Sequence, residues 1–251
     1  MKGAKVIAIT GGSSGIGAAL ADHVTRGPIG HTVVLVARRS APLEAIAERC
    51  HGRAHVIVAD VTDRVEVRRV VAEAVAAAGH IDVWVNNVGQ GITRAPIEVT
   101  DEDIDAMITV NVKSALYGMQ EVLPHFRKRG TGHIINISSM LGRIPHALGR
   151  SVYSASKHFL NALTENFRRD VQETHPGIQV SLVSPGVVYT EFGNNAVHGG
   201  PDSRAIPGGQ MPEEVAEVIA RVIESRAPDV YTAAGSSARV AAYYAGLGVD
   251  P

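Results

Sequence analysis

The sequence predicts an α/β domain in which helices cover both faces of one doubly wound parallel sheet. Three observations lead to this fold class: short β-branched runs recur along the chain, segments of helical composition separate them, and each run is continuously apolar rather than alternating. Continuous apolar runs are typical of strands buried on both faces, and strands that alternate with helices form parallel sheets. The length of 251 residues suits a single domain, so we expect residues 1–251 to form one unit.

Six apolar runs are the expected strands of this sheet. In chain order they are Val6–Ile9, Val33–Val36, Val56–Val58, Val83–Val85, Ile134–Ile137 and Val180–Val183. Asp229–Thr232 is a candidate for one further short strand. Such short runs, rich in valine and isoleucine, are typical of buried strands.

The stretches between these runs predict the helices. In chain order they are Ile16–Arg26, Ala41–Cys50, Arg64–Ala78, a helix that begins after Thr100 and runs past Met107, Val112–Arg129, Val152–Glu173 and a helix that begins at Pro212. Thr100 is followed three residues later by Asp103, which is a helix-capping signal. Proline is favoured in the first turn of a helix, which agrees with a start at Pro212.

Residues 187–211 show neither pattern. They contain five glycines and two prolines. A loop of this length inside a compact domain is typically a functional lid or a disordered segment. We therefore expect residues 187–211, called the lid segment below, to close over a substrate.

The composition excludes several kinds of partner. The chain has 24 basic and 25 acidic residues and a net charge of -1, which argues against nucleic-acid binding. No apolar run approaches the roughly 20 residues of a membrane span, so no membrane partner is expected. The single cysteine, Cys50, cannot form an intrachain disulfide, and the 11 histidines form no cluster with metal-ligand spacing. We expect a cytoplasmic protein without a metal site.

A glycine-rich turn follows the first strand directly. In Thr10–Gly17 the residues Gly11, Gly15 and Gly17 have the spacing Gly-x-x-x-Gly-x-Gly. Glycine allows positive φ and close approach of the backbone to a pyrophosphate, and the following helix offers N–H donors to an anion. A nucleoside-triphosphate loop is excluded because no Gly-Lys-Ser/Thr follows. The position of the turn predicts a dinucleotide site on a Rossmann-type sheet, the alternative being a tight turn without a ligand.

The end of the second strand bears on cofactor choice. NAD sites usually place an acidic residue here for the ribose 2′-hydroxyl, but Ala37 has no carboxylate. Arg38 and Arg39 instead offer guanidinium groups that suit a 2′-phosphate, and Ser13 could add a hydroxyl. We therefore expect NADP(H) rather than NAD, the alternative being two solvated surface arginines.

Two further turns lie at strand ends. Asp60 and Val61 follow the third strand, where a carboxylate could accept a hydrogen bond from the adenine amino group. Asn86–Gly89 ends the fourth strand, close to the switch point where such sheets bind ligands. Ordinary turn chemistry is the alternative for both, since Asp, Asn and Gly dominate turns.

A tyrosine and a lysine carry the candidate chemistry. Tyr153 and Lys157 are four residues apart and share one face of a helix. A nearby ammonium favours the phenolate and should lower the pKa of the phenol, which could then exchange a proton with a carbonyl or alcohol oxygen. Ser139 follows the fifth strand, and Asn111 lies inside a helix, where asparagine is unfavourable. These residues are the candidate catalytic set.

Together these motifs resemble the short-chain dehydrogenase/reductase family, over nearly the whole chain. The resemblance is to its single-domain branch with an Asn–Ser–Tyr–Lys tetrad. It depends on Thr10–Gly17, Asn86–Gly89, Asn111, Ser139, Tyr153–Lys157 and Pro185–Thr190, which occur in the family's order and approximate spacing. It implies that Tyr153 is the general acid/base and that Lys157 lowers its pKa and binds the nicotinamide ribose. Ser139 would hydrogen-bond the substrate oxygen, and Asn111 would hold a water that links Lys157 to solvent.

The resemblance also implies a cofactor-binding set. Gly11, Ser13, Ser14, Gly15, Ile16 and Gly17 would surround the phosphates, Arg38 and Arg39 the 2′-phosphate, Asp60 and Val61 the adenine, Asn87, Val88 and Gly89 the neighbouring ribose, and Pro185, Gly186, Val188 and Thr190 the nicotinamide, together with Tyr153 and Lys157. The chain departs from the family pattern in three ways. Val88 replaces an alanine, Ser14 replaces a basic residue of many NADP users, and the stretch between Ser139 and Tyr153 is one residue longer, which leaves Ser138 as an alternative serine.

The sequence therefore predicts an oxidoreductase that transfers a hydride between NADP(H) and a ketone or secondary alcohol. Five side chains suggest an apolar substrate: Met140, Leu141, Ile144, Val187 and Phe192. A nucleotide-sensing binding protein on the same fold is the alternative, and a methyltransferase would leave Tyr153 and Lys157 unexplained. The resemblance further implies a homodimer or homotetramer packed through the two long helices.

Overall fold

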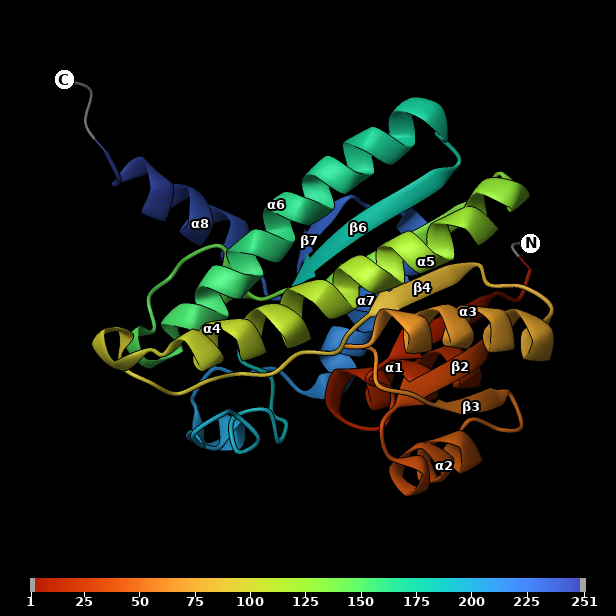
Figure 1. Cartoon of the computed structure of the whole chain (residues 1–251), viewed down its shortest axis with the longest axis horizontal. Coiled ribbons are helices and arrows are strands. Elements are labelled where there is room, and N and C mark those ends of the chain that lie inside the picture. Colours follow the sequence, from red (N-terminus) through yellow and green to blue (C-terminus); the bar gives the residue numbers. More distant parts are fainter. Residues whose placement is uncertain (1–2, 249–251) are drawn as a thin grey trace.

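A seven-stranded parallel sheet forms the centre of the computed structural model, which describes residues 3–248 (Figure 1). The strand order is β3-β2-β1-β4-β5-β6-β7. The strands are β1 (Val6–Thr10), β2 (Thr32–Ala37), β3 (Ala54–Val58), β4 (Val83–Asn86), β5 (Gly132–Ile137), β6 (Ile178–Ser184) and β7 (Asp229–Tyr231). All six apolar runs of the sequence are strands, and the candidate seventh strand is confirmed.

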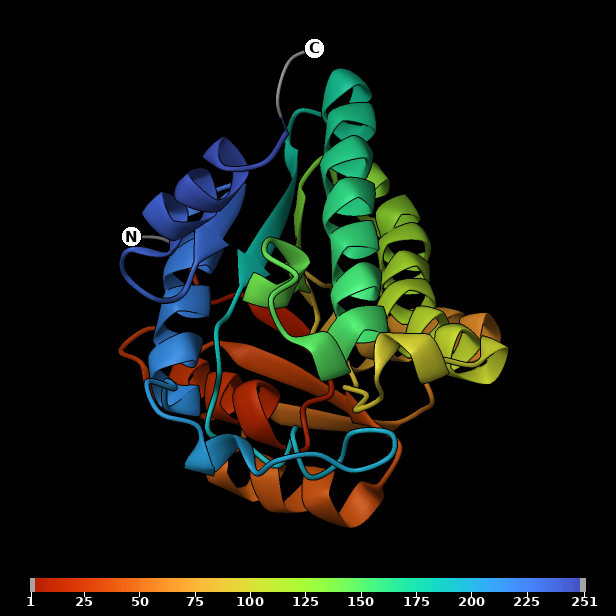
Figure 2. The ribbon, with the colours of Figure 1, turned by 90° about the vertical axis from the view of Figure 1, so that its left-hand side faces the viewer.

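Helices cover both faces of the sheet, as expected. They are α1 (Gly15–Arg26), α2 (Ser40–Arg49), α3 (Arg64–Ala78), α4 (Asp101–Ile108), α5 (Ser114–Arg129), α6 (Ser151–Thr174), α7 (Pro212–Ser225) and α8 (Ser236–Ala245). The side chains of α3, α5 and α6 form one core with the sheet, and those of α1, α2 and α7 form the other. Figure 2 shows these two helical layers on opposite sides of the strands.

The strand order reverses direction between β1 and β4. β1 pairs in parallel with both, so that Ile7 lies opposite Val33 of β2 and opposite Val83 of β4. All three side chains are at most 1% exposed, which explains why these runs are continuously apolar. Ligands of doubly wound sheets bind at the carboxyl edge beside such a reversal, so the fold places a candidate site after β1 and β4.

The helix that contains Asn111 differs from the prediction. We expected one helix past Met107 and a separate one over Val112–Arg129, but α4 and α5 form one continuous run. Residues Thr109–Lys113 join them as a π-helical turn, in which the backbone N–H of Ser114 donates to the carbonyl of Thr109. Such a turn accommodates one extra residue in a helix and is frequent at functional sites. The sequence shows only that asparagine is unusual here.

Other local predictions have mixed outcomes. The capping signal is confirmed, because Thr100 and Asp103 each accept a hydrogen bond from the other's backbone N–H. Helix α7 begins at Pro212 as expected. Helix α8 was not predicted, and of its residues only Ser236 is buried. No helix in the described part of the chain is long and apolar enough to cross a membrane.

Candidate active site

The carboxyl edge of the sheet gathers four loops. They are the glycine-rich turn after β1, Asn87–Gly89 after β4, the two serines after β5 and Pro185–Thr190 after β6. Asn87 links the first two, because its side-chain Nδ2 donates to the carbonyls of Thr10 and Gly11 at 3.2 Å each. The motifs at the strand ends therefore meet at one edge of the sheet.

The glycine-rich turn has the backbone that the spacing predicts. Gly11 and Gly15 have φ of +67° and +52°, the left-handed region that favours glycine. A Cβ on Gly17 would collide with the carbonyl oxygen of Gly11 and would lie 2.8 Å from Nδ2 of Asn87. Helix α1 begins directly after this turn, with neither a side-chain cap nor an acidic residue in its first turn. The turn and the helix N-terminus thus fit an anionic group such as a pyrophosphate.

The outer part of the cofactor set lies on β2 and β3. Arg38 and Arg39 follow β2 and are exposed, and neither forms an ion pair with another described residue. Asp60 follows β3, where its Oδ1 accepts from the backbone N–H and the hydroxyl of Thr62 at 3.0 and 2.8 Å. Val61 is buried beside it. Both arginines are therefore available to an anion, and the second oxygen of Asp60 is available to a donor.

Val88 and Ser14, the two residues of the set that depart from the family pattern, both lie at the glycine-rich turn. Val88 packs against the glycine-rich turn, with its Cγ2 only 3.3 Å from the place of a Cβ on Gly11. Ser14 is the N-terminal cap residue of α1 and is exposed, while Ser13 beside it is half-buried. Valine thus narrows the space next to the turn.

The loop after β6 returns to the glycine-rich turn. The carbonyl of Pro185 accepts from the N–H of Met140 at 2.7 Å. Val188 is buried, and the Cγ2 of Thr190 lies 3.2 Å from the place of a Cβ on Gly15. A Cβ on Gly186 would meet no atom within 4 Å. The contact between Thr190 and Gly15 brings the residues expected to bind the nicotinamide next to those expected to bind the pyrophosphate.

Asn111 connects the loop after β4 with α6. Its amide forms a reciprocal pair with the backbone of Gln90, accepting from the N–H at 2.9 Å and donating to the carbonyl at 3.0 Å. Its Nδ2 also approaches Oγ of Ser156 at 3.2 Å. The π-helical turn directs Asn111 inward, where it is fully buried. The side chain therefore holds the backbone of the site in place.

Lys157, on α6, extends between the end of β5 and the loop after β4. Its Nζ donates to the carbonyl of Ile137 at 3.0 Å, and a Cβ on Gly89 would lie 3.5 Å from it. Burial lowers the pKa of Lys157 to about 8. The Nζ lies 5.8 Å from the centre of the Tyr153 ring.

The pKa of Tyr153 differs from the expectation of the sequence analysis. Burial raises the pKa of its phenol to about 12, although a hydrogen bond to Ser139 and the positive charge of Arg150 both act to lower it. We expected Lys157 to lower this pKa below its usual value. Removal of the phenolate from water raises the pKa more than Ser139 and Arg150 lower it, because the residue is only 7% exposed. The phenol is therefore protonated at neutral pH and can act as a proton donor.

The two serines after β5 have different neighbours. Ser139 accepts from the N–H of Leu141 at 3.1 Å and lies close enough to the Tyr153 phenol to lower its pKa. Ser138 donates to Oδ1 of Asn161 instead. The structure thus brings Ser139, and not Ser138, to the phenol.

Tyr153 also belongs to an apolar cluster. It contains Ile92, Met107 and Tyr153, with Leu141, Val152, Phe192 and Val197 packed against it. The ring of Phe192 meets that of Tyr153 edge-on, with 5.5 Å between centroids. Of the five predicted pocket residues, Met140 and Ile144 are buried, whereas Val187 is 36% exposed.

The lid segment folds back over this cluster. Val197 forms a β-bridge with Ile92, and His198 bonds to Oδ1 of Asp103 at 2.8 Å. Arg94 pairs with the other oxygen of Asp103 at 3.2 Å. This attachment could not be predicted, because Asp103 lies 95 residues before His198 in the chain.

Comparisons with known proteins identify the family and the fold of this chain. A model of the short chain dehydrogenase family matches residues 5–199. An uncharacterized oxidoreductase of Staphylococcus epidermidis is 36% identical over 186 residues, which cover 74% of this chain and 79% of that protein. An alcohol dehydrogenase of Thermococcus sibiricus, solved with 5-hydroxy-NADP, is 26% identical with a TM-score of 0.77, covering 90% of this chain and 94% of its own. A short chain dehydrogenase/reductase of Burkholderia phymatum, solved with NAD, has a TM-score of 0.87 at 22% identity, covering 99% and 98%.

Proposed function

The chain belongs to the short-chain dehydrogenase family of oxidoreductases, and we propose that it transfers a hydride between NADP(H) and a ketone or secondary alcohol. The observation that carries the proposal is the buried group of Ser139, Tyr153 and Lys157 next to a backbone cradle that fits a dinucleotide. When bound, the nicotinamide would supply or accept the hydride. The residues of the chain bind the two reactants and move the proton.

Tyr153 is the proposed proton donor to the carbonyl oxygen during reduction. Its raised pKa keeps the phenol protonated, and Ser139 is placed to hydrogen-bond the same substrate oxygen. The Lys157 ammonium would stabilise negative charge that develops on the phenol as the proton leaves. Asn111 holds the backbone at Gln90 and is a positioning residue in this proposal.

The cofactor would lie along the carboxyl edge of the sheet. Its pyrophosphate would be held by Gly11–Gly17 and its adenine by Asp60 and Val61. Asn87–Gly89 would contact the ribose, and Pro185, Gly186, Val188 and Thr190 would contact the nicotinamide. The absence of a carboxylate at Ala37, with the unpaired Arg38 and Arg39 after it, supports NADP(H) over NAD. Solved relatives of this fold include one with NAD and one with an NADP derivative, so cofactor choice rests on these residues.

The apolar cluster around Tyr153 supports a substrate with an apolar body.

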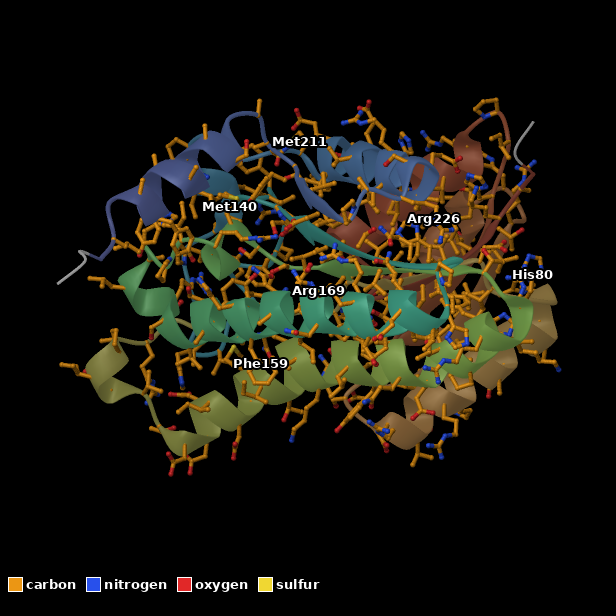
Figure 3. All side chains as sticks on the ribbon, turned by 90° about the horizontal axis from the view of Figure 1, so that it is seen from above. His80, Met140, Phe159, Arg169, Met211 and Arg226 are labelled. Carbon is orange, nitrogen blue, oxygen red and sulfur yellow. The ribbon has the colours of Figure 1, made fainter. Side chains whose placement is uncertain are left out.

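We also propose a homodimer or homotetramer packed through α5 and α6. Figure 3 shows these helices side by side at the surface, and Phe159 on α6 is 53% exposed there. Cys50 is a buried free thiol, which suits the cytoplasmic location that we propose.

A panel of ketones and secondary alcohols, assayed with NADPH, NADH and their oxidised forms, tests the proposal. We expect cofactor-dependent turnover that is faster with the phosphorylated cofactor. Tight NADPH binding without turnover of any carbonyl compound would instead support the nucleotide-sensing alternative.

A further inference from the structure

Arg150 is a half-buried cation that the proposed reaction does not use. It immediately precedes α6 and lies three residues before Tyr153. Its terminal nitrogen NH1 is buried and has no hydrogen-bond partner. No described residue forms an ion pair with Arg150, whereas Arg94 in the facing loop is neutralised by Asp103. A guanidinium nitrogen that is buried without a partner is unfavourable, so this one is ready to bind an anion.

A second unpaired group lies beside it. The hydroxyl of Thr93 is also buried without a hydrogen-bond partner. A Cβ on Gly200 of the lid segment would lie 2.8 Å from Arg150 NH2 and 2.9 Å from Thr93 Oγ1, so both side chains converge on this glycine. A guanidinium and a hydroxyl are the donors that a carboxylate accepts from. Two orphaned donors at one place are a stronger indication than either alone.

These donors lie next to the reacting group. A Cβ on Gly91 would collide with Arg150 NH1 and would lie 3.0 Å from the ring of Phe192, which itself meets the Tyr153 ring. The charge of Arg150 is close enough to act on the pKa of the Tyr153 phenol. Helix α6 also begins here without an acidic residue or a side-chain cap, which leaves its positive end uncompensated. The loop after β4, the start of α6 and the lid segment thus form one positively charged corner of an apolar cluster.

We propose that Arg150 and Thr93 bind a carboxylate of the substrate, so that the enzyme interconverts oxo acids and hydroxy acids. This inference rests on the proposed function and names its substrate class. The carbonyl carbon gains a hydride from NADPH and the carbonyl oxygen gains a proton from Tyr153, which yields the hydroxy acid and NADP⁺. The carboxylate is unchanged and serves to orient the carbonyl. The apolar body lies against Ile92 and Phe192.

The first test compares oxo acids with their methyl esters. Each pair, with the oxo group two to five carbons from the acid end, differs in charge but little in shape. We expect the wild type to prefer the acid at one or more chain lengths. Arg150→Met should lower kcat/KM for that acid roughly 10- to 150-fold, the range for a lost charge-assisted hydrogen bond, and change the ester little. Arg127→Met, at the far end of α5, is the matched control and should retain the preference.

Two further variants guard against misfolding of Arg150→Met. Arg150→Lys keeps the charge and should keep part of the preference for the acid. Thr93→Val preserves the shape of the side chain and should reduce kcat/KM for the acid roughly 2- to 10-fold. A wild type that favours the ester at every chain length would overturn the inference, while turnover of the esters would leave the proposed function intact.

A binding measurement separates the two proposals. Unreactive alkanoates, from butanoate to octanoate, are titrated by calorimetry into the protein with NADP⁺. Binding that Arg150→Met abolishes supports the carboxylate site even if no carbonyl compound is turned over, in which case the proposed function fails alone. Absence of alkanoate binding, or equal binding by Arg150→Met, contradicts the carboxylate site.

Discussion

Replacement of Lys157 by methionine should change how the free energy of unfolding depends on pH. Lys157 is buried, and burial lowers its pKa from 10.5 to about 8 in the folded chain. Between these two values the unfolded chain holds a proton that the folded chain has released. The free energy of unfolding therefore rises with pH in this window, and the group destabilises the fold below pH 8. The methionine variant has no such group and should lack the rise.

The size of the effect follows from the shift. Each pKa unit corresponds to about 1.4 kcal/mol, so the contribution of Lys157 should increase by about 2.5 kcal/mol between pH 7 and 10. Tyr153 acts in the opposite direction, because its pKa is raised to about 12. The unfolded phenol loses its proton first, near pH 10, so stability from this group declines above that pH. Measurements should therefore end at pH 10.

The assay is urea unfolding of the cofactor-free protein at several pH values from 7 to 10. The quantity of interest is the difference between wild type and Lys157→Met, because other titrating groups and the lost contact to Ile137 then cancel or stay constant. Lys128→Met, which removes an exposed lysine of α5, should follow the wild type. Repeating the comparison in a Tyr153→Phe background removes the opposing phenol. If the free energies of unfolding of wild type and Lys157→Met differ by the same amount from pH 7 to 10, burial does not lower the pKa of Lys157 and the argument is refuted.

Three other predictions concern function. Tyr153→Phe removes the proposed proton donor and should reduce turnover about 10²- to 10⁴-fold, with NADPH affinity near wild type because the phenol is not a main contact of the cofactor; a variant with more than about a tenth of wild-type turnover would contradict its assignment. The wild type should prefer NADPH over NADH about 10- to 150-fold in kcat/KM, and Ala37→Asp with Arg38→Leu should erase or invert this ratio, so a wild-type preference for NADH would disprove the reasoning. Residues 192–210 should exchange amide hydrogens more slowly once cofactor and substrate bind, and equal protection in both states would identify an ordinary surface loop.

The fold could be predicted from the sequence because its signals are local. A strand buried on both faces is apolar along most of its length, and β1, β2 and β4 meet this condition over Val6–Ile9, Val33–Val36 and Val83–Val85. The same holds for Gly11 and Gly15, whose positive φ leaves a direct trace in residue type. Motif order then indicated the candidate tetrad, because each member lies on an element whose position the sheet dictates.

Features that depend on neighbours distant in the chain could not be predicted. The π-helical turn at Asn111 differs from an α-helix only by a hydrogen-bond shift, and helix composition carries little trace of it. The attachment of the lid segment depends on His198 meeting Asp103, which lies 95 residues earlier. Helix α8 buries only Ser236, so it lacks the core-facing stripe by which the other helices were predicted.

The sequence by itself determined the sheet, the glycine-rich turn and the identities of the candidate catalytic residues. Only the tertiary structure decided their chemistry. The direction of the Tyr153 pKa depends on how completely other elements exclude water, and burial exceeds the influence of the nearby charges. In the sequence, nothing distinguishes Arg150 from an ordinary arginine before a helix. It becomes a candidate ligand for a carboxylate because Gly91 and Gly200, from two other loops, enclose it beside Thr93, and one nitrogen of Arg150 and the Thr93 hydroxyl are left without a hydrogen-bond partner.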